Sequence, residues 1–398
     1  MSLPLEGLKI LSVEQYGAGP FGTQHLADLG AEVIKIENPS MGGDVGRHVG
    51  PYFFDELDSH FYQSFNRNKK SVTLNLKSKE GMELFRELVK ESDAVYNNLR
   101  GDLPASLGLT YEDLQEVNPQ VVCAHLSAYG REGTRANWPG YDYLMQAEAG
   151  YLSLTGEPDG APARFGLSII DMMTGTMSAL ALVSAVLSAR ETGKGRDIDV
   201  SLFSVALHNL SYPATWYLNE GVVTTRQPRS SHPSLTPSQL YRTKDGWIFI
   251  MCNKEKFFGL LCEAIGKDEW IDDPRFVDFD ARLKNRDLLT KMLDETLSTE
   301  TTAHWMGKFG GTIPSAPVND VAQALDNPFA YEQGLVVSST HEKRGEFRTT
   351  ACPISSPGVQ LPTRRAPKLG EHNAEIFARA PQGDSPEKLE DLKRRGII

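Results

Sequence analysis

One aspartate stands where a carboxylate could act as a nucleophile. Asp171 follows the largely apolar residues 167–170 (LSII) and leads into a long apolar segment. An ionised carboxylate in such surroundings is costly unless it is hydrogen-bonded or paired. The free N–H groups and the dipole of a helix N-terminus supply that compensation. A charged carboxylate held away from water is a competent nucleophile, although an ordinary N-capping aspartate explains the same pattern.

A glycine-rich turn indicates a different chemistry. Residues 17–22 (GAGPFG) follow a strand pattern, open a helix pattern and fit GxGxxG, and the next strand ends in Glu37. In a dinucleotide-binding fold the glycines admit a pyrophosphate and the acid binds a ribose hydroxyl, which predicts an NAD-dependent oxidoreductase. Pro20, however, lacks one of the backbone N–H groups that would hold phosphate. A purely structural turn explains the motif at least as well.

Alternating strand and helix patterns fill the first 130 residues. The fold that they form must position both Asp171 and the glycine-rich turn. Strands are expected at 8–14, 32–37, 71–76, 93–98 and 121–127, and another at 193–202 after the apolar segment. Helices are expected at 21–29, 78–92 and 110–116, with Ser78 as an N-cap. This βαβ rhythm predicts an α/β fold in which a Rossmann-like large domain contains a parallel sheet.

A change of composition divides the chain further on. Residues 222–238 are rich in Ser, Thr and Pro and lack apolar periodicity, which is typical of a linker. A hairpin at 240–252 with Asp245-Gly246 at its turn, and helices at 254–266, 284–298 and 300–309, predict a smaller α+β domain. We therefore expect a large domain over 1–222, a small domain over 223–335, and a segment 336–398 that returns to the large domain.

Composition and charge exclude several classes of protein. The chain of 398 residues has 41 basic and 52 acidic side chains and a net charge of −11, which argues against nucleic acid as a partner. The four cysteines fit neither a metal site nor a disulfide framework, and no secretory signal is evident. The apolar segment Ser168–Ala189 is long enough to span a bilayer, but Asp171 would be costly in lipid. A cytoplasmic protein with a buried core helix and no membrane contact is predicted.

Several segments, taken in order, resemble one enzyme family. They are PLEGLKILSVEQYGAGPFGTQHLADLGAEVIKIE, NRNKKSVTLNLKSKEG, NNLRGDLPASLGL, GYDYLMQAEAG, IIDMMTGTMSALAL, GKGRDIDVSL and APKLGEHNAEIF. Together they resemble the class III CoA-transferases, which include formyl-CoA transferase and the carnitine CoA-transferases, over nearly the whole chain. The resemblance implies that the GAGPFG turn belongs to a CoA-binding domain without nicotinamide. It also implies an interlocked, ring-shaped homodimer.

The resemblance assigns roles to particular residues. The family nucleophile matches Asp171, which implies transfer of CoA from an acyl-CoA donor to a carboxylic acid acceptor. The route passes through mixed-anhydride and aspartyl-CoA thioester intermediates and needs no metal and no tightly bound cofactor, CoA itself being a substrate. Arg47 is a phosphate partner by charge alone. The matching CoA-contact positions are Gln15, Tyr16, Leu74, Lys77, Asn98, Leu99 and Arg100, and the matching acyl-pocket positions are Gly17, Tyr141 and Asp142.

Departures from the family pattern narrow the range of substrates that we expect. Formyl-CoA transferase has a glutamine at the position of Gly17 and four glycines where this chain has residues 230–240 (SSHPSLTPSQL), so oxalate is not expected. The latter segment is more similar to members that use succinyl-CoA and dicarboxylic acids. Related acyl-CoA racemases carry a histidine at the position of Tyr141, and without it a two-base racemisation is difficult. The racemase, the NAD-dependent oxidoreductase and a non-enzymatic regulatory dimer are the alternatives, since fold alone does not fix activity.

Overall fold

The computed structural model describes residues 2–398 and divides them into two compact units. Unit 1 comprises the residues up to Ala149 together with Gly166–Ser211 and Phe329–Ile398, and unit 2 comprises Gly150–Phe165 and Tyr212–Pro328. The predicted domain boundaries were 222 and 335. The assignment of Gly150–Phe165 to unit 2 had no counterpart in the sequence prediction, because that segment carries no strand or helix pattern.

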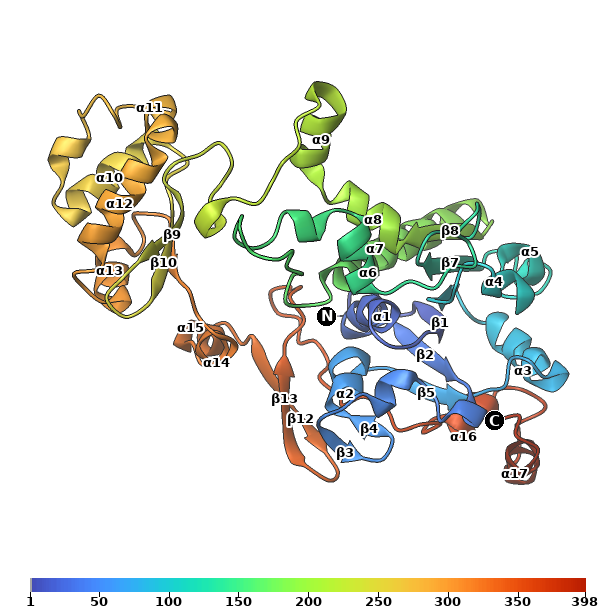
Figure 1. Cartoon of the computed structure of the whole chain (residues 1–398). Coiled ribbons are helices and arrows are strands. Elements are labelled where there is room, and N and C mark those ends of the chain that lie inside the picture. The colour runs from blue at the N-terminus through green and yellow to red at the C-terminus, as the bar shows by residue number, and fades with distance from the viewer. Residues whose placement is uncertain (1) are drawn as a thin grey trace. The chain divides into compact units, whose positions relative to one another are not determined.

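Unit 1 is built on a six-stranded parallel sheet with the order β5-β2-β1-β6-β7-β8 (Figure 1). Its register places Leu11 beside both Ile34 and Val95. Strand order reverses at β1, so the connections on its two sides run in opposite directions. All six strands confirm the sequence prediction: β1 (Lys9–Val13), β2 (Glu32–Glu37), β5 (Lys70–Thr73), β6 (Ala94–Asn97), β7 (Val122–Ser127) and β8 (Arg196–Ser201).

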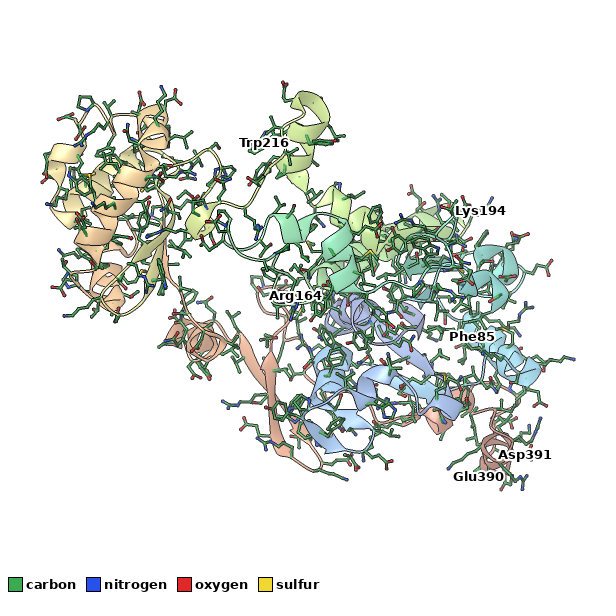
Figure 2. The ribbon with its side chains drawn as sticks, in the orientation of Figure 1. Phe85, Arg164, Lys194, Trp216, Glu390 and Asp391 are labelled. Carbon is green, nitrogen blue, oxygen red and sulfur yellow. The ribbon has the colours of Figure 1, made fainter. Side chains whose placement is uncertain are left out.

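Helices cover both faces of this sheet because its buried strands present side chains alternately to each face. On one face, the Tyr96 hydroxyl lies 2.9 Å from Ser178 Oγ of α7 (Ile169–Thr192). On the other, Val95 packs in a core that includes Phe85 of α3 (Lys79–Val89), labelled in Figure 2. Ser78 Oγ accepts the N–H of Gly81 at 3.0 Å and caps α3 as predicted.

Helices α1 (Ala18–Asp28) and α7 cross at very short range. A Cβ on Gly22 would lie 2.4 Å from the carbonyl oxygen of Gly175, and one on Gly175 would lie 2.4 Å from that of Ala18. Only glycine allows the two backbones to approach so closely. Because α7 also packs against β7 and β8, it is a core helix of unit 1, as the charge of Asp171 predicted.

The C-terminal segment completes the core of unit 1. Ile376 and Phe377 of α16 (Asn373–Phe377) and Leu392 of α17 (Pro386–Arg394) are buried with Leu11, Val72 and other sheet residues. The same segment carries the hairpin of β12 (Val336–His341) and β13 (Gly345–Thr350). Short elements that lack a clear periodicity were not predicted in unit 1: β3 (Phe53–Asp55), β4 (Asp58–Ser59), α2 (His60–Asn66), α4 (Leu103–Ser106), α6 (Asp142–Glu148) and α8 (Leu202–His208).

Unit 2 combines a three-stranded antiparallel sheet, in the order β11-β10-β9, with helices. The predicted hairpin is present as β9 (Ser238–Arg242) and β10 (Trp247–Met251), and β11 (Ser315–Pro317) extends it. Its core includes Tyr241, Ile248 and Leu293. The helices that lie wholly or mainly in unit 2 are α9 (Ser211–Glu220), α10 (Glu255–Ile265), α11 (Phe279–Lys284), α12 (Arg286–Leu297), α13 (Thr302–Phe309) and α14 (Val321–Leu325). Helix α15 (Pro328–Glu332) lies mainly in unit 1, as does α5 (Tyr111–Leu114), which was predicted from the sequence.

Candidate active site

A cavity of about 190 Å³ lies at the carboxyl ends of the unit 1 strands. Its walls come from the residues that follow β1, β6, β7 and β8, at the point where the strand order reverses. Open parallel sheets bind ligands at this topological switch point. The lining residues are Gln15, Tyr16, Gly17, Ala18, Asn98, Leu99, Arg100, Leu126, Ser127, Ala128, Trp138, Pro139, Gly140, Tyr141, Asp171 and Leu202.

The cavity brings together most of the residues singled out from the sequence. Eight of them line it directly, and Asp142 bonds to the backbone of Asp171 beside it. The sequence analysis missed the apolar wall formed by Leu126, Ala128, Trp138 and Leu202. A signal was available for part of this wall, because residues 126–128 and 202 lie at or directly after the ends of β7 and β8.

Asp171 is the third residue of α7 and is 9% exposed. Its N–H donates to Asp142 Oδ2 at 2.9 Å, and Gln146 Nε2 donates to Asp142 Oδ1 at 2.5 Å. The N-cap position belongs to Ser168, so Asp171 is not an N-capping aspartate. Asp142 of α6 therefore fixes the start of α7 and the backbone of Asp171.

The protonation of the Asp171 carboxyl group differs from the one expected from the sequence. Burial, and after it the negative charge of Asp142, raise the pKa of Asp171 to about 7. The helix N-terminus therefore does not keep this carboxylate fully ionised at neutral pH, which corrects the sequence prediction. A buried carboxyl group that changes its protonation near neutral pH beside a cavity is characteristic of a functional site.

Glycines of the 17–22 turn allow close approaches around Asp171. A Cβ on Gly17 would lie 2.8 Å from Asp171 Oδ2, and one on Gly19 would lie 2.7 Å from Asn98 Cγ. Asn98 also accepts the N–H of Gln15 at 2.9 Å and donates to its carbonyl at 2.8 Å. The glycines of GAGPFG thus serve contacts with Asp171, Asn98 and α7.

Replacing Gly17 with Ala should disturb the position of Asp171 more than the fold. The added methyl group would displace Asp171 or the loop, and a misplacement of about 1 Å can cost roughly a hundredfold in rate. We expect kcat to fall at least about tenfold, with little change in Tm. The control is Gly307→Ala in α13, where an added Cβ meets nothing within 4 Å; equal kcat values for the two variants would contradict the close contact.

Three predicted CoA-contact residues lie away from the cavity. Leu74 is 1% exposed and belongs to the core, and Lys77 is exposed but does not line the cavity. Arg47 is 1% exposed, and its Nε and Nη2 donate to Glu37 at 2.8 and 2.7 Å. Its Nη1 donates to the carbonyl of Leu57 at 3.2 Å. The expectation that Arg47 contacts a phosphate is therefore wrong, because its guanidinium is buried and bonded to protein acceptors.

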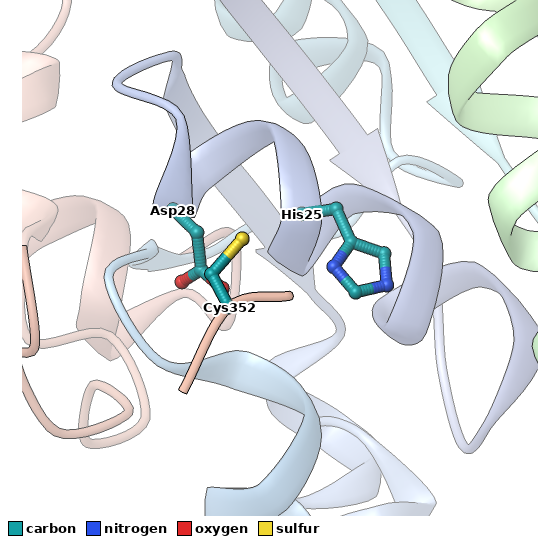
Figure 3. A group of neighbouring side chains, drawn as sticks. All are labelled: His25, Asp28 and Cys352. Atoms are coloured by element: carbon teal, nitrogen blue, oxygen red, sulfur yellow. The ribbon is translucent and has the colours of Figure 1, made fainter. Parts of the chain in front are cut away.

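Among residues 2–398, one group of side chains has the spacing of a metal site. Ligand atoms of His25, Asp28 and Cys352 lie within 4.8 Å of one another (Figure 3). Arg67 already pairs with Asp28 through Nη2 at 2.6 Å, and Asn68 Nδ2 donates to its other oxygen at 2.6 Å. A divalent cation would meet the guanidinium charge directly, so these residues do not fit a metal ion.

Unit 1 thus combines a parallel sheet with a buried carboxylate beside a cavity at its topological switch point. The chain belongs to CoA-transferase family III, which it matches over residues 5–373. It is 32% identical over 397 residues to human succinyl-CoA:glutarate CoA-transferase, covering 99% of this chain and 90% of the relative. It is 35% identical over 379 residues to acetyl-CoA:oxalate CoA-transferase of Acetobacter aceti, covering 94% and 95%. The crystal structure of a CAIB/BAIF family protein from Brucella suis superposes with a TM-score of 0.83 at 33% identity, covering 95% of this chain and 99% of that one.

Family membership decides between the alternatives raised by the sequence. The protein is a CoA-transferase, and the family uses CoA thioesters and carboxylic acids as substrates. The dinucleotide-binding interpretation of residues 17–22 and the non-enzymatic regulatory dimer are thereby set aside. No histidine occurs among the described residues that line the cavity, which agrees with a transferase rather than a two-base racemase.

Proposed function

We propose that this CoA-transferase works through Asp171 as its nucleophile and covalent carrier. The observation that carries the proposal is the placement of one buried carboxylate in a cavity at the switch point, with Gly17 leaving free the space beside its Oδ2, where a Cβ would lie 2.8 Å away. Any larger residue at position 17 would occupy the space beside that oxygen. A carboxylate that is partly desolvated and open on one side is suited to attack a thioester carbonyl.

The reaction proceeds in four steps. The ionised Asp171 oxygen attacks the donor thioester carbonyl and expels CoA thiolate, which leaves a mixed anhydride. The thiolate attacks the aspartyl carbonyl, releases the donor acid and forms an aspartyl-CoA thioester. The acceptor carboxylate attacks that thioester, which gives a new anhydride and thiolate. The thiolate then attacks the acceptor's carbonyl, which forms the product acyl-CoA and restores the Asp171 carboxylate.

Each step passes through a tetrahedral oxyanion that requires hydrogen-bond donors. The first N–H groups of a helix have no acceptor within it, and Gly17 and Ala18 at the start of α1 line the cavity. We assign the oxyanion contact to these two N–H groups. Removal of one such donor from an enzyme typically costs about 3–4 kcal/mol in the transition state.

The remaining cavity residues are proposed to hold CoA and the acyl group. Asn98 is already bonded to Gln15, so it shapes the loop while Leu99 contacts the pantetheine arm. Arg100 pairs with Asp102 at 2.6 Å and is exposed, so it must exchange that partner to meet a phosphate. Lys77 is proposed as a phosphate contact and Leu74 as a contact through its backbone. Gln15, Tyr16, Gly17, Tyr141 and Asp142 are proposed to surround the acyl group.

The donor is proposed to be a dicarboxylic acyl-CoA such as succinyl-CoA. Support comes from relatives at about 30% identity that are named as succinyl-CoA-dependent enzymes, with glutarate or mesaconate as the second acid. The cavity itself is lined by one cation, Arg100.

Trapping with hydroxylamine tests the nucleophile. The enzyme is incubated with succinyl-CoA or acetyl-CoA, treated with hydroxylamine and digested, and the peptide that contains Asp171 is examined by mass spectrometry. We expect a hydroxamate on Asp171, formed more rapidly with succinyl-CoA, and none without a CoA thioester. Asp171→Ala should give no hydroxamate and lose transferase activity at least about a thousandfold. A label on another residue, or turnover retained by Asp171→Ala, would exclude the mechanism.

A homodimer and a cytoplasmic location are also proposed. The outward face of α7 exposes Met177, Leu180 and Leu187 by 36%, 62% and 63%, and apolar faces of this kind are usually covered by a partner. A second copy of the chain, interlocked with the first, is the proposed partner. All four cysteines are free thiols, three of them buried, which suits a reducing compartment.

A further inference from the structure

The backbone of Tyr16 adopts a left-handed conformation beside the proposed nucleophile. Its φ is 67°, which lies in a strained region that residues with a Cβ rarely adopt. Tyr16 lines the cavity and precedes Gly17, where a Cβ would lie 2.8 Å from Asp171 Oδ2. Such strain persists only where surrounding contacts impose it, and it is concentrated at functional sites. The groups that hold Tyr16 therefore bear on the geometry of the site.

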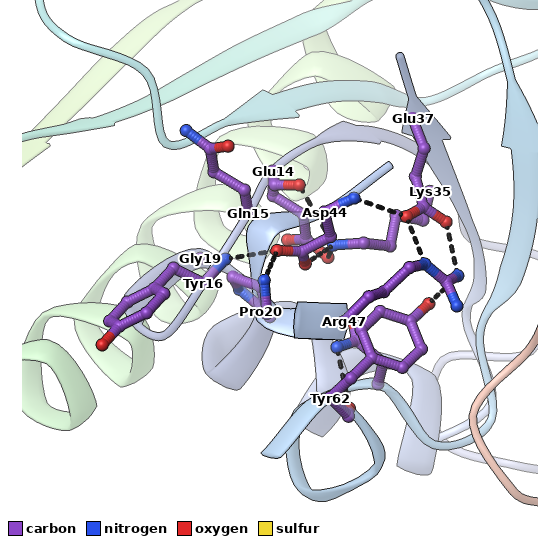
Figure 4. A network of polar contacts seen from close by, with 12 residues as sticks. Glu14, Gln15, Tyr16, Gly19, Pro20, Lys35, Glu37, Asp44, Arg47 and Tyr62 are labelled. Atoms are coloured by element: carbon purple, nitrogen blue, oxygen red, sulfur yellow. Dashed lines mark hydrogen bonds and ion pairs between the residues drawn. The ribbon is translucent and has the colours of Figure 1, made fainter. Parts of the chain in front are cut away.

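A cluster of six charged side chains lies behind this loop, and each of them is at most 4% exposed (Figure 4). We call it the buried charge cluster, and its three acids and three bases balance: Glu14, Glu37, Asp44, Lys35, Arg47 and Lys69. Its ion pairs are short, with Lys35 Nζ 2.7 Å from Asp44 Oδ2 and Lys69 Nζ 2.8 Å from Glu14 Oε1. Buried ion pairs are often no more stabilising than apolar residues of the same volume. Stability alone therefore does not account for the cluster.

Asp44 is the member of the cluster that bonds to the strained residue. Its Oδ1 accepts the N–H of Tyr16 at 2.8 Å and that of Gly46 at 2.7 Å. Its own N–H donates to Glu37 Oε2 at 2.9 Å. Lys35, which pairs with Asp44, also donates to the carbonyl of Glu14 at 3.0 Å. The cluster thus holds the chain on both sides of Gln15.

We propose that Asp44 is a positioning residue for the transfer reaction. Held by Lys35 and by the N–H of Gly46, its carboxylate retains Tyr16 in the left-handed conformation and thereby keeps Gly17 against Asp171. Asp44 does not line the cavity and acts only through the backbone of Tyr16. The proposal rests on the proposed function of Asp171 as nucleophile. It adds the requirement that Asp44 hold the backbone of Tyr16. Without the acceptor oxygen, Tyr16 relaxes to negative φ and Gly17 moves.

Two substitutions of Asp44 separate positioning from stability. Asp44→Ala and Asp44→Asn both remove the charge that pairs with Lys35, but only Asn keeps an oxygen that accepts the Tyr16 N–H. Both are made in the Lys35→Met background, in which no buried ammonium is left without its partner and both variants are expected to fold. The readouts are the rate of hydroxamate formation on Asp171 in a single turnover with succinyl-CoA, and Tm.

We expect both variants to fold, with a lower Tm for Lys35→Met/Asp44→Ala, because alanine also leaves the N–H groups of Tyr16 and Gly46 without their acceptor; the rates are therefore compared at a temperature well below both Tm values. The rate with Lys35→Met/Asp44→Ala should be at least about tenfold lower than with Lys35→Met/Asp44→Asn, as expected for a displaced reacting group. Equal rates would overturn the positioning role while leaving the nucleophile intact. Absence of any hydroxamate in the unsubstituted enzyme would instead reject the proposed function of Asp171, so the two failures are distinguishable.

Discussion

Replacing Asp171 with Asn should make the protein more stable and nearly inactive. The amide cannot attack a thioester as a carboxylate does, and loss of a covalent nucleophile typically costs at least about a thousandfold in kcat. The gain in stability follows from the pKa of Asp171, which burial and Asp142 raise to about 7. Each unit of pKa shift corresponds to about 1.4 kcal/mol, so a rise from 3.8 sets an upper limit of roughly 4 kcal/mol on the gain.

The sign of the pH dependence distinguishes this explanation from a general effect of the substitution. A raised pKa means that the folded state resists ionisation, so Asp171 lowers the free energy of unfolding progressively from about pH 4 to about pH 7 and no further above that. Urea unfolding should therefore show equal stability of Asp171→Asn and the unsubstituted protein near pH 4, with the largest difference above pH 7. The exposed Asp159→Asn should show no such trend. A stability difference that is constant with pH would contradict the raised pKa.

The same titration governs the chemical step, with the opposite consequence for activity. In the proposed mechanism only the ionised carboxylate attacks the thioester, so the rate of the first covalent step should rise with pH and level off above about 7. The environment that makes Asp171 unfavourable for folding is also what leaves its carboxylate poorly solvated. Functional sites commonly lower stability in this way.

The architecture of the sheet could be predicted because its signal is local. Strands of this parallel sheet carry short apolar runs, such as Val122–Ala124 in β7 and Val33–Ile34 in β2. Segments such as α6 and α8 have only seven residues each. So short a segment spans about two helical turns and displays no clear period of 3.6 residues.

Part of the candidate active site could be predicted from the sequence. Whether a residue could be predicted depends on whether a local pattern marks its position. Gln15 and Asn98 follow predicted strands, so the resemblance and the strand pattern agree on them. Gly17 and Asp171 are far apart in the chain, and no local pattern reports that a Cβ at position 17 would lie 2.8 Å from Asp171 Oδ2. The apolar wall around Trp138 comes from a loop without periodicity. These features depend on tertiary packing and become visible only in the folded structure.

Arg47 shows where charge alone misleads. An arginine in a glycine-rich loop has the same sequence appearance whether it binds a ligand phosphate or a buried acid. In the structure it bonds to Glu37, the last residue of β2, at a distance of 2.7 Å. Burial raises the pKa of Glu37, but the hydrogen bond and charge of Arg47, together with Lys35, outweigh that effect and hold the pKa below its usual value. The guanidinium of Arg47 therefore forms an ion pair with Glu37, and no sequence pattern predicts that these two residues pair.

Replacing Arg47 with Met should consequently damage the fold rather than CoA binding alone. The substitution leaves the Glu37 carboxylate buried without its main partner and gives the buried charge cluster a net negative charge. Breaking a buried ion pair in this way costs about 3–5 kcal/mol, measurable as a lower urea midpoint. The deficit should be smaller at pH 5 than at pH 8, because the unpaired Glu37 is then closer to protonation.

Removing both charges tests that explanation directly. Arg47→Met/Glu37→Gln restores the charge balance of the cluster and keeps an oxygen that accepts the N–H of Asp44. Since replacing both members of a buried pair is much less costly than removing one, the double variant should recover more than half of the lost stability. It should also lose the difference between pH 5 and pH 8. If Arg47→Met instead unfolded at the midpoint of the unsubstituted protein and bound CoA at least tenfold more weakly, Arg47 would be a ligand contact. The buried pairing with Glu37 predicts the opposite result, because the cost arises within the folded chain before any CoA is present.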